Sequence, residues 1–176
     1  GFICSSNKQI VQIQQIIGEL CDRYGEPAHA GWKTFPTDVR LAATTEADLR
    51  DCRMGYRAKY LHASASMIAS NKVDLAAIAT LDYLDAQTEL KRLPGIGPKV
   101  ADCILLFAYG FPEAFPIDTW VLKALRQLYF PRRRPTPRQL HTFIREHFAP
   151  YHGYAQQYLF HHVRTHDGLL SGNQKT

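Results

Sequence analysis

Four residues in the middle of the chain have types and a spacing that suit chemistry on a phosphate-bearing substrate. Gly95 and Gly97 belong to the run LPGIGPK over residues 93–99, which ends at Lys99, and Asp118 follows nineteen residues later. Glycine accepts positive φ and leaves no side chain between the backbone and a ligand, so this turn can present N–H groups to a phosphate. The lysine supplies an amine nucleophile, and the carboxylate supplies a partner for it.

Together these features predict a protein that holds DNA through phosphate and attacks a sugar carbon. Lys99 follows Pro98 at the start of a helical pattern, where apolar neighbours would remove water from the amine and favour its neutral, nucleophilic form. Asp118 precedes another helical pattern, whose dipole keeps a carboxylate ionised. Each feature also has a plainer interpretation: an αα-hairpin turn, a solvated surface lysine, and an N-cap.

The elements that must position these residues are helices, and we predict an all-α fold. Apolar residues recur with helical spacing, and no strand or repeat is evident. Expected N-caps are Ser5 or Ser6, Thr45 with Asp48, and Thr136 followed by a first-turn proline. Helices are expected from these serines to Tyr24, over 56–69, 81–93 and 98–109, after Asp118, after Thr136, and over about 153–163.

Composition limits the function further. The 176 residues carry a formal charge of +5 with pI near 9.1, which fits one domain or two small lobes and a polyanionic partner. No apolar run reaches the roughly 20 residues of a membrane span, and no targeting segment is seen, which favours the cytoplasm or nucleus. The four cysteines and eight histidines lack metal-ligand spacing, so we expect no cofactor and no catalytic metal.

Five ordered blocks carry a resemblance to a known family. They are FICSSN at 2–7, GYRAKY at 55–60, the 93–103 hairpin, PID at 116–118, and GYAQ at 153–156 with Phe160. The chain thereby resembles the helix–hairpin–helix/Gly-Pro-Asp base-excision DNA glycosylases, and among them the 8-oxoguanine DNA glycosylase/AP lyases. The resemblance implies a helix–hairpin–helix glycosylase fold with two helical lobes and the active site in the cleft between them.

The resemblance also implies a role for each matching residue. Lys99 would attack C1′ as a Schiff-base nucleophile, and Asp118 would assist it. Cys103 and Phe160 would sandwich the flipped base, with Gln156 hydrogen-bonding its edge. Asn7, Tyr56 and Arg57 would fill the gap in the duplex and read the opposite cytosine, while Gly95 and Gly97 would hold phosphate, with a monovalent cation as an option at the hairpin.

Plainer interpretations stay open for the residues that rest on the resemblance. Cys103 and Phe160 fit ordinary core positions, Gln156 fits a surface amide, and Tyr56 with Arg57 fits a helix cap with a solvated charge. The basic run Arg132-Arg133-Arg134 fits either a phosphate contact or a solvated loop.

Three departures from the family pattern affect the expected function. The resemblance begins at Phe2, so we predict one glycosylase domain over 1–176, with the hairpin motif at about 84–109 and without the N-terminal sheet lobe of many members. Trp120 stands where better-known members have a phosphate-contacting histidine, and is expected to stack in the core or on DNA. Gln12 replaces a common basic residue, so contacts around the opposite cytosine are expected to be relaxed.

The predicted activity is removal of 8-oxoguanine opposite cytosine from duplex DNA through a lysine Schiff base, followed by β-elimination. The predicted protein is a monomer that acts on double-stranded DNA containing an oxidised base and does not bind membranes. Two alternatives remain: the same fold acting on another oxidised purine, and a helix–hairpin–helix DNA-binding module without catalysis.

Overall fold

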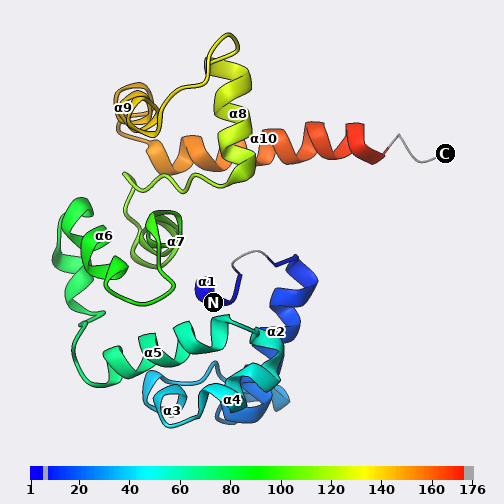
Figure 1. The fold of residues 1–176 in the computed structure, drawn as a ribbon, viewed down its shortest axis with the longest axis vertical. Helices are drawn as coiled ribbons and strands as arrows, with labels where there is room; N and C mark the ends of the chain where they lie inside the picture. The colour runs from blue at the N-terminus through cyan, green and yellow to red at the C-terminus, as the bar shows by residue number, and fades with distance from the viewer. Residues whose placement is uncertain (6–7, 173–176) are drawn as a thin grey trace. The chain divides into compact units, whose positions relative to one another are not determined.

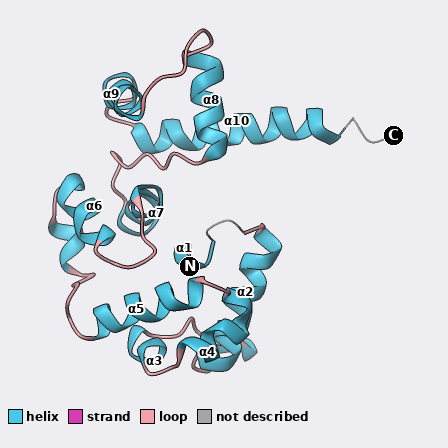
Figure 2. Cartoon of the chain, viewed as in Figure 1, coloured by secondary structure: helices cyan, strands magenta, loops and turns pink. Residues whose placement is uncertain are grey.

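The fold is helical throughout the part of the chain that can be described (Figures 1 and 2). The computed structural model describes residues 1–5 and 8–172, with side chains through residue 165. Within these ranges there is no named strand, and Pro27 and Lys33 form an isolated antiparallel bridge. The predicted all-α class is therefore confirmed. None of the described helices has the length and apolar character needed to cross a membrane.

The chain divides into two compact units, residues 1–97 and 98–176. The boundary lies inside the predicted hairpin motif, between Gly97 and Pro98. The glycines of the hairpin thus belong to unit 1, and the lysine that follows them belongs to unit 2.

Unit 1 is built from several short helices and two longer ones. Its elements are α1 (Phe2–Ser5), α2 (Ile10–Tyr24), η1 (His29–Gly31), α3 (Asp38–Ala42), α4 (Glu46–Leu49), η2 (Arg50–Met54), α5 (Arg57–Ala69), η3 (Ala77–Thr80) and α6 (Tyr83–Lys91). Their apolar faces meet in a core that includes Ile16, Leu20, Leu49, Met54 and Leu61. Burial of these side chains is the main source of stability for helices that are too short to persist alone.

The N-terminal helix begins later than the sequence predicts. Ser5 closes the separate helix α1, and its Oγ donates to the carbonyl of Phe2 at 2.8 Å. The capping box of α2 is instead formed by Gln9 and Gln12, whose side-chain oxygen accepts from the Gln9 N–H at 3.2 Å. The expectation of a serine N-cap is therefore wrong, because the Ser5 hydroxyl is used inside the preceding turn.

Unit 2 contains α7 (Pro98–Ile104), η4 (Leu105–Tyr109), α8 (Thr119–Tyr129), α9 (Pro137–His147) and α10 (His152–Gly172). Its core includes Phe115, Val121, Leu125, Ile144 and Leu159. The predicted 98–109 helix is interrupted, since its second half changes to a wider π turn at Leu105. The last helix continues nine residues beyond the predicted end at 163.

The close approach of Gly153 fixes the start of α10 against the loop that precedes α8. The Gly153 N–H donates to the Pro112 carbonyl at 2.9 Å. A Cβ at this position would lie 2.4 Å from Leu106 Cδ1, so a larger residue would require the Leu106 side chain to move. This contact positions the helix that carries Gln156 and Phe160.

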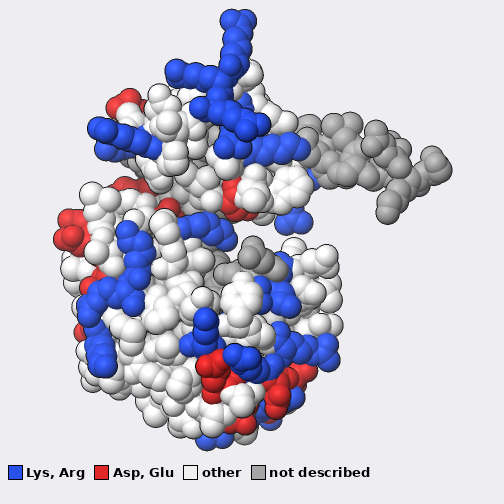
Figure 3. Space-filling view, viewed as in Figure 1, with Lys and Arg blue, Asp and Glu red and all other residues white. Residues whose placement is uncertain are grey.

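Basic side chains concentrate on one part of unit 2. Figure 3 shows Lys and Arg gathering over α8 and the loop that follows it. The loop is fixed at its far end by α9, where Thr136 and Gln139 form a capping box and Pro137 occupies the first turn. The predicted cap at Thr136 is confirmed, as is the one formed by Thr45 and Asp48.

Candidate active site

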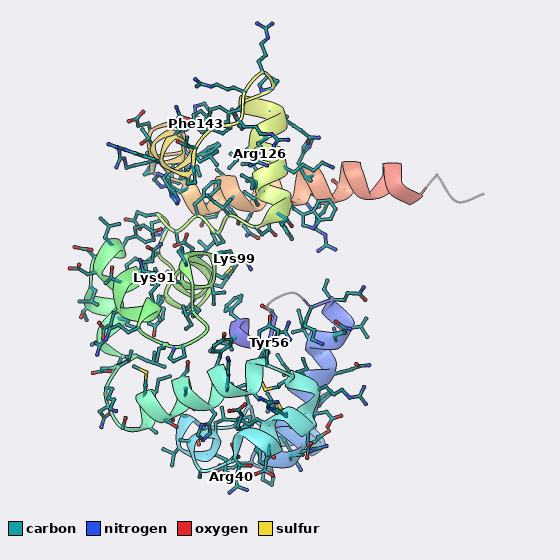
Figure 4. All side chains as sticks on the ribbon, in the orientation of Figure 1. Arg40, Tyr56, Lys91, Lys99, Arg126 and Phe143 are labelled. Atoms are coloured by element: carbon teal, nitrogen blue, oxygen red, sulfur yellow. The ribbon has the colours of Figure 1, made fainter. Side chains whose placement is uncertain are left out.

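The candidate nucleophile lies in the first turn of α7. Lys99 is the second residue of this helix, directly after Pro98, and its side chain is exposed (Figure 4). Proline suits a first-turn position because its missing N–H has no helical partner there. The expected dehydration of the amine by apolar neighbours is therefore wrong for this structure, and bulk water reaches the amine.

Lys99, Cys103 and Asp118 form an electrostatic cluster within unit 2. Burial raises the pKa of the Cys103 thiol, the charge and hydrogen bond of Lys99 oppose that rise, and the charges of Asp102 and Asp118 add to it. Lys99 and Cys103 are one turn apart on α7, so their side chains share a face. The structure thus brings together the predicted nucleophile, its carboxylate partner and one predicted pocket residue.

Asp118 is held in place as the N-cap of α8. Its Oδ1 accepts from the Val121 N–H at 2.7 Å, and the residue is half-buried. This bond satisfies an otherwise unpaired N–H in the first turn, and the N-terminal end of the helix dipole favours a carboxylate. Both interpretations of Asp118 remain compatible, because the capping bond holds the carboxylate where its charge acts on the Cys103 thiol.

Gln156 is a buried residue of α10, and its interpretation as a surface amide is wrong. Its side chain is 4% exposed, and its Nε2 donates to the Pro116 carbonyl at 3.1 Å. Pro116 is two residues before Asp118, so this bond ties α10 to the segment that carries the carboxylate. Gln157 Nε2 donates to Gln156 Oε1 at 2.5 Å. The amide is therefore oriented by two partners.

The other two predicted pocket residues keep a structural role as well. Cys103 is 5% exposed, and Phe160 packs against the core of unit 2 while remaining partly accessible. Arg164 lies over the Phe160 ring at 5.5 Å from its centroid. Core packing therefore accounts for both positions. Whether they sandwich a base stays a prediction.

A cavity of about 390 Å³ opens beside Lys99. Its lining combines one acidic residue with basic and apolar ones: Pro98, Lys99, Asp102, Ile117, Leu122, Arg126, Pro135, Pro137, Leu140 and His141. Sequence analysis missed Asp102, which is buried and lies three residues after Lys99, and Arg126 on α8. The i, i+3 spacing of Lys99 and Asp102 was the available signal for the first. For Arg126 there was none, because only the packing of α8 places it at this cavity.

The predicted DNA-gap residues lie in unit 1, where Tyr56 is 48% exposed. Its ring packs edge-on against Tyr60, with centroids 6.1 Å apart, and carries the Arg57 guanidinium 4.4 Å from its centroid. Arg57 itself is 5% exposed and donates to the Met54 carbonyl at 3.4 Å, so its interpretation as a solvated charge is wrong. Trp120, in unit 2, is 39% exposed and does not stack in the core. Asn7 lies outside the described residues.

The hairpin glycines form part of a second cavity, of about 430 Å³. It is lined by Ile3, Tyr56, Arg57, Tyr60, Gly95 and Gly97, together with 91–94 and Ile96. Gly95 has φ +83°, and an added Cβ would lie 2.8 Å from Tyr60 Cβ. Gly97 has no positive φ, and nothing lies within 4 Å of an added Cβ. Only Gly95 therefore requires glycine for its conformation.

Two hydrogen bonds to backbone carbonyls also hold the hairpin in place. Ser64 Oγ donates to the Pro94 carbonyl at 2.8 Å, and the Ile96 N–H donates to the Leu93 carbonyl at 3.1 Å. Backbone carbonyls of this turn are the ligands that a monovalent cation would need, and these two already accept hydrogen bonds. The cation at the hairpin stays a prediction.

Alanine substitutions at the two hairpin glycines should differ in their effect on stability. Gly95→Ala should lower the free energy of unfolding by about 2 kcal/mol or more, since it combines left-handed backbone with a clash against Tyr60. Gly97→Ala should change it by less than about 1 kcal/mol in either direction. Urea denaturation of both variants measures the difference. Equal destabilisation would contradict the assignment of the strained position to Gly95.

Comparisons with known proteins identify the family of the chain. A family model described as HhH-GPD superfamily base excision DNA repair protein matches residues 1–150. A Methanothermobacter thermautotrophicus protein named "Probable N-glycosylase/DNA lyase" is 41% identical, over 93% of this chain and 56% of its own length. The N-glycosylase/DNA lyase of Saccharomyces cerevisiae is 34% identical, over 73% of this chain and 38% of its own length. The chain spans about half the length, or less, of the curated relatives it matches.

The chain is also similar to a solved structure of a DNA glycosylase. The Clostridium acetobutylicum 8-oxoguanine glycosylase/lyase, in complex with double-stranded DNA containing cytosine opposite 8-oxoguanine, superposes with a TM-score of 0.87 at 37% identity. The match covers 94% of this chain and 58% of that protein. Since the family model covers most of the sequence, the chain belongs to the HhH-GPD superfamily of base excision DNA repair proteins.

Proposed function

We propose that this protein is a bifunctional DNA glycosylase/AP lyase that removes 8-oxoguanine opposite cytosine from duplex DNA. The observation that carries the proposal is the grouping of Lys99, Cys103 and Asp118 within unit 2. A monofunctional glycosylase activates water and does not need an amine beside its carboxylate. Support also comes from the names of similar proteins, which include N-glycosylase/DNA lyases and an 8-oxoguanine glycosylase/lyase.

In the proposed reaction, the neutral amine of Lys99 attacks C1′ of the damaged nucleotide. The N-glycosidic bond breaks, and its electron pair leaves with the base, which takes up a proton. Asp118 assists by accepting charge or a proton from the amine and by stabilising positive charge that develops on the sugar. DNA that covers the exposed Lys99 would remove its water and supply the dry surroundings that the free protein lacks.

The covalent intermediate then directs strand cleavage. Opening of the sugar gives a protonated imine between Nζ of Lys99 and C1′, which makes the C2′ proton more acidic. Loss of that proton forms a C2′–C3′ double bond and expels the 3′ phosphate, so the strand is nicked 3′ to the lesion. Each step uses the bound amine, and no metal or cofactor enters the scheme.

The flipped base is proposed to lie between Cys103 and Phe160, with Gln156 bonding its edge. Cys103 suits this place because its burial favours the neutral thiol, which packs as a small apolar group. Gln156 has little rotational freedom, since its amide bonds Pro116 and Gln157. A fixed amide can discriminate between base edges better than a mobile one, because a mismatched partner leaves it unpaired.

Tyr56 is the proposed wedge for the vacated space in the duplex. Its exposed ring is supported by Tyr60 and by the guanidinium of Arg57, so it can enter a base stack without first losing much rotamer freedom. Arg57 is proposed to read the opposite cytosine together with Asn7, which requires the arginine to turn from the Tyr56 ring toward DNA. Backbone N–H groups at Gly95 and Gly97 are proposed to hold phosphate.

Borohydride trapping tests the proposal on three matched duplexes. One contains 8-oxoguanine opposite cytosine, one an abasic site opposite cytosine, and one is undamaged. Borohydride reduces the imine to a stable amine, so a shifted protein–DNA band records the covalent intermediate. We expect a band with the first two duplexes and none with the third.

The pattern of bands also distinguishes the alternatives. A band with the abasic duplex alone would overturn 8-oxoguanine as substrate while keeping the lyase chemistry, and a panel of other oxidised purines would then identify the lesion. Binding to all three duplexes without any band would overturn catalysis and leave a DNA-binding module.

A further inference from the structure

The positive charge of the chain is concentrated in one segment of unit 2. Residues 119–145 contain seven lysines and arginines and no aspartate or glutamate: Lys123, Arg126, Arg132, Arg133, Arg134, Arg138 and Arg145. Removing these seven from the 21 basic residues of the chain leaves 14, against 16 acidic residues. The net charge of +5 therefore arises entirely from this segment, while the rest of the chain is slightly acidic.

Four of these arginines share one concave surface. A cavity of about 610 Å³ is lined by Arg126, Arg132, Arg133 and Arg134, with Gln127, Phe130 and Pro131, and we call this lining the arginine surface. The four side chains are exposed. Ion pairs such as that of Arg50 with Glu46 lie in unit 1, and within the described part of the chain none joins these four arginines to a carboxylate. Their charges remain available to an external anion.

The loop that carries three of them is held in shape before any ligand binds. Phe130 is buried in the core of unit 2, and the Arg133 N–H donates to its carbonyl at 3.3 Å. Pro131 and Pro135 fix φ on either side of the arginines, and Pro135 is buried. A loop that is already ordered loses less conformational entropy when it binds, which favours its use as a contact surface.

Arg126 connects this surface to the candidate nucleophile. Its side chain lines the arginine surface and also lines the cavity that contains Lys99 (Figure 4). A polyanion seated along the arginine surface therefore continues toward Lys99 within a single unit.

We propose that the arginine surface binds the phosphate backbone of duplex DNA flanking the lesion. This inference rests on the proposed function for the position of the lesion at Lys99, whereas the charge distribution supports phosphate binding independently. Arginine suits phosphate because its planar guanidinium can donate two parallel hydrogen bonds. Such contacts position DNA without reading its sequence, and each one releases condensed counterions.

The test is the salt dependence of binding to undamaged duplex DNA. Arg132→Gln/Arg134→Gln removes two charges and spares Arg133, whose guanidinium packs 5.5 Å from the Phe130 ring centroid. We expect affinity to fall about tenfold at moderate salt, and the slope of log affinity against log salt to flatten by about 2, since each phosphate contact contributes about 0.9. Arg132→Lys/Arg134→Lys should retain most of the slope, because both charges remain.

A matched control removes the same charge from unit 1. Arg40→Gln/Lys72→Gln neutralises two exposed residues there and should leave the slope unchanged. Equal flattening in the control and test pairs, or no flattening in the test pair with a native melting temperature, would overturn the proposal. Because the assay uses undamaged DNA, failure of covalent trapping would sink the proposed activity without altering this result.

Discussion

Replacing Lys99 with glutamine is expected to abolish the covalent band on 8-oxoguanine duplex and to lower the rate of base release by about 10³-fold or more. The amide has no lone pair basic enough to attack C1′, so neither the imine nor β-elimination can follow. Because Lys99 is exposed and in the first turn of α7, the variant should keep the melting temperature of the wild type. Single-turnover excision and borohydride trapping measure the effect.

Two further variants separate the nucleophile from the charge. Lys99→Arg retains the positive charge near phosphate but stays protonated, so it should bind DNA as well as the wild type and form no covalent band. Lys72→Gln removes an exposed lysine from unit 1 and should leave trapping intact. Full base release by Lys99→Gln would overturn the covalent mechanism and favour water as the nucleophile.

Local signals in the sequence predicted most of the helix starts. Thr136 with Pro137 and Asp118 with Val121 are confirmed because a cap depends on residues within one turn. Likewise, Lys99 and Cys103 share a face through i, i+4 spacing alone. The first helix start is wrong because two serines competed with Gln9, and the Ser5 hydroxyl bonds backwards to Phe2.

The burial of polar site residues could not be predicted from local sequence patterns. Gln156 is buried because its amide meets the Pro116 carbonyl, 40 residues earlier in the chain. A polar side chain becomes buried only where tertiary packing supplies a partner, and a helical pattern does not reveal that partner. The exposure of Lys99 has a local origin instead, since consecutive residues of a helix point in different directions and Val100 and Ala101 lie on other faces of α7.

Replacing Asp118 with asparagine is also expected to slow base excision strongly. This one substitution separates the role of Asp118 as the cap of α8 from its proposed role in assisting Lys99. Asn caps a helix about as well as Asp, so Asp118→Asn should retain the bond from the Val121 N–H and change the free energy of unfolding by less than about 0.5 kcal/mol. It removes the negative charge that acts on the Cys103 thiol. We therefore expect base excision to slow by about 10²- to 10³-fold.

The matched control is the same change at another cap. Asp82 caps α6, where its Oδ1 accepts from the Asp85 N–H at 3.0 Å, and Asp82→Asn should leave excision unchanged. Asp118→Ala should add a stability loss of about 1 kcal/mol to the loss of activity, since it removes the cap as well. Wild-type excision by Asp118→Asn, together with slow excision by Asp118→Ala, would show that Asp118 acts only through the helix. Urea denaturation and single-turnover excision, measured on the same preparations, decide between a carboxylate that assists the amine and one that holds α8.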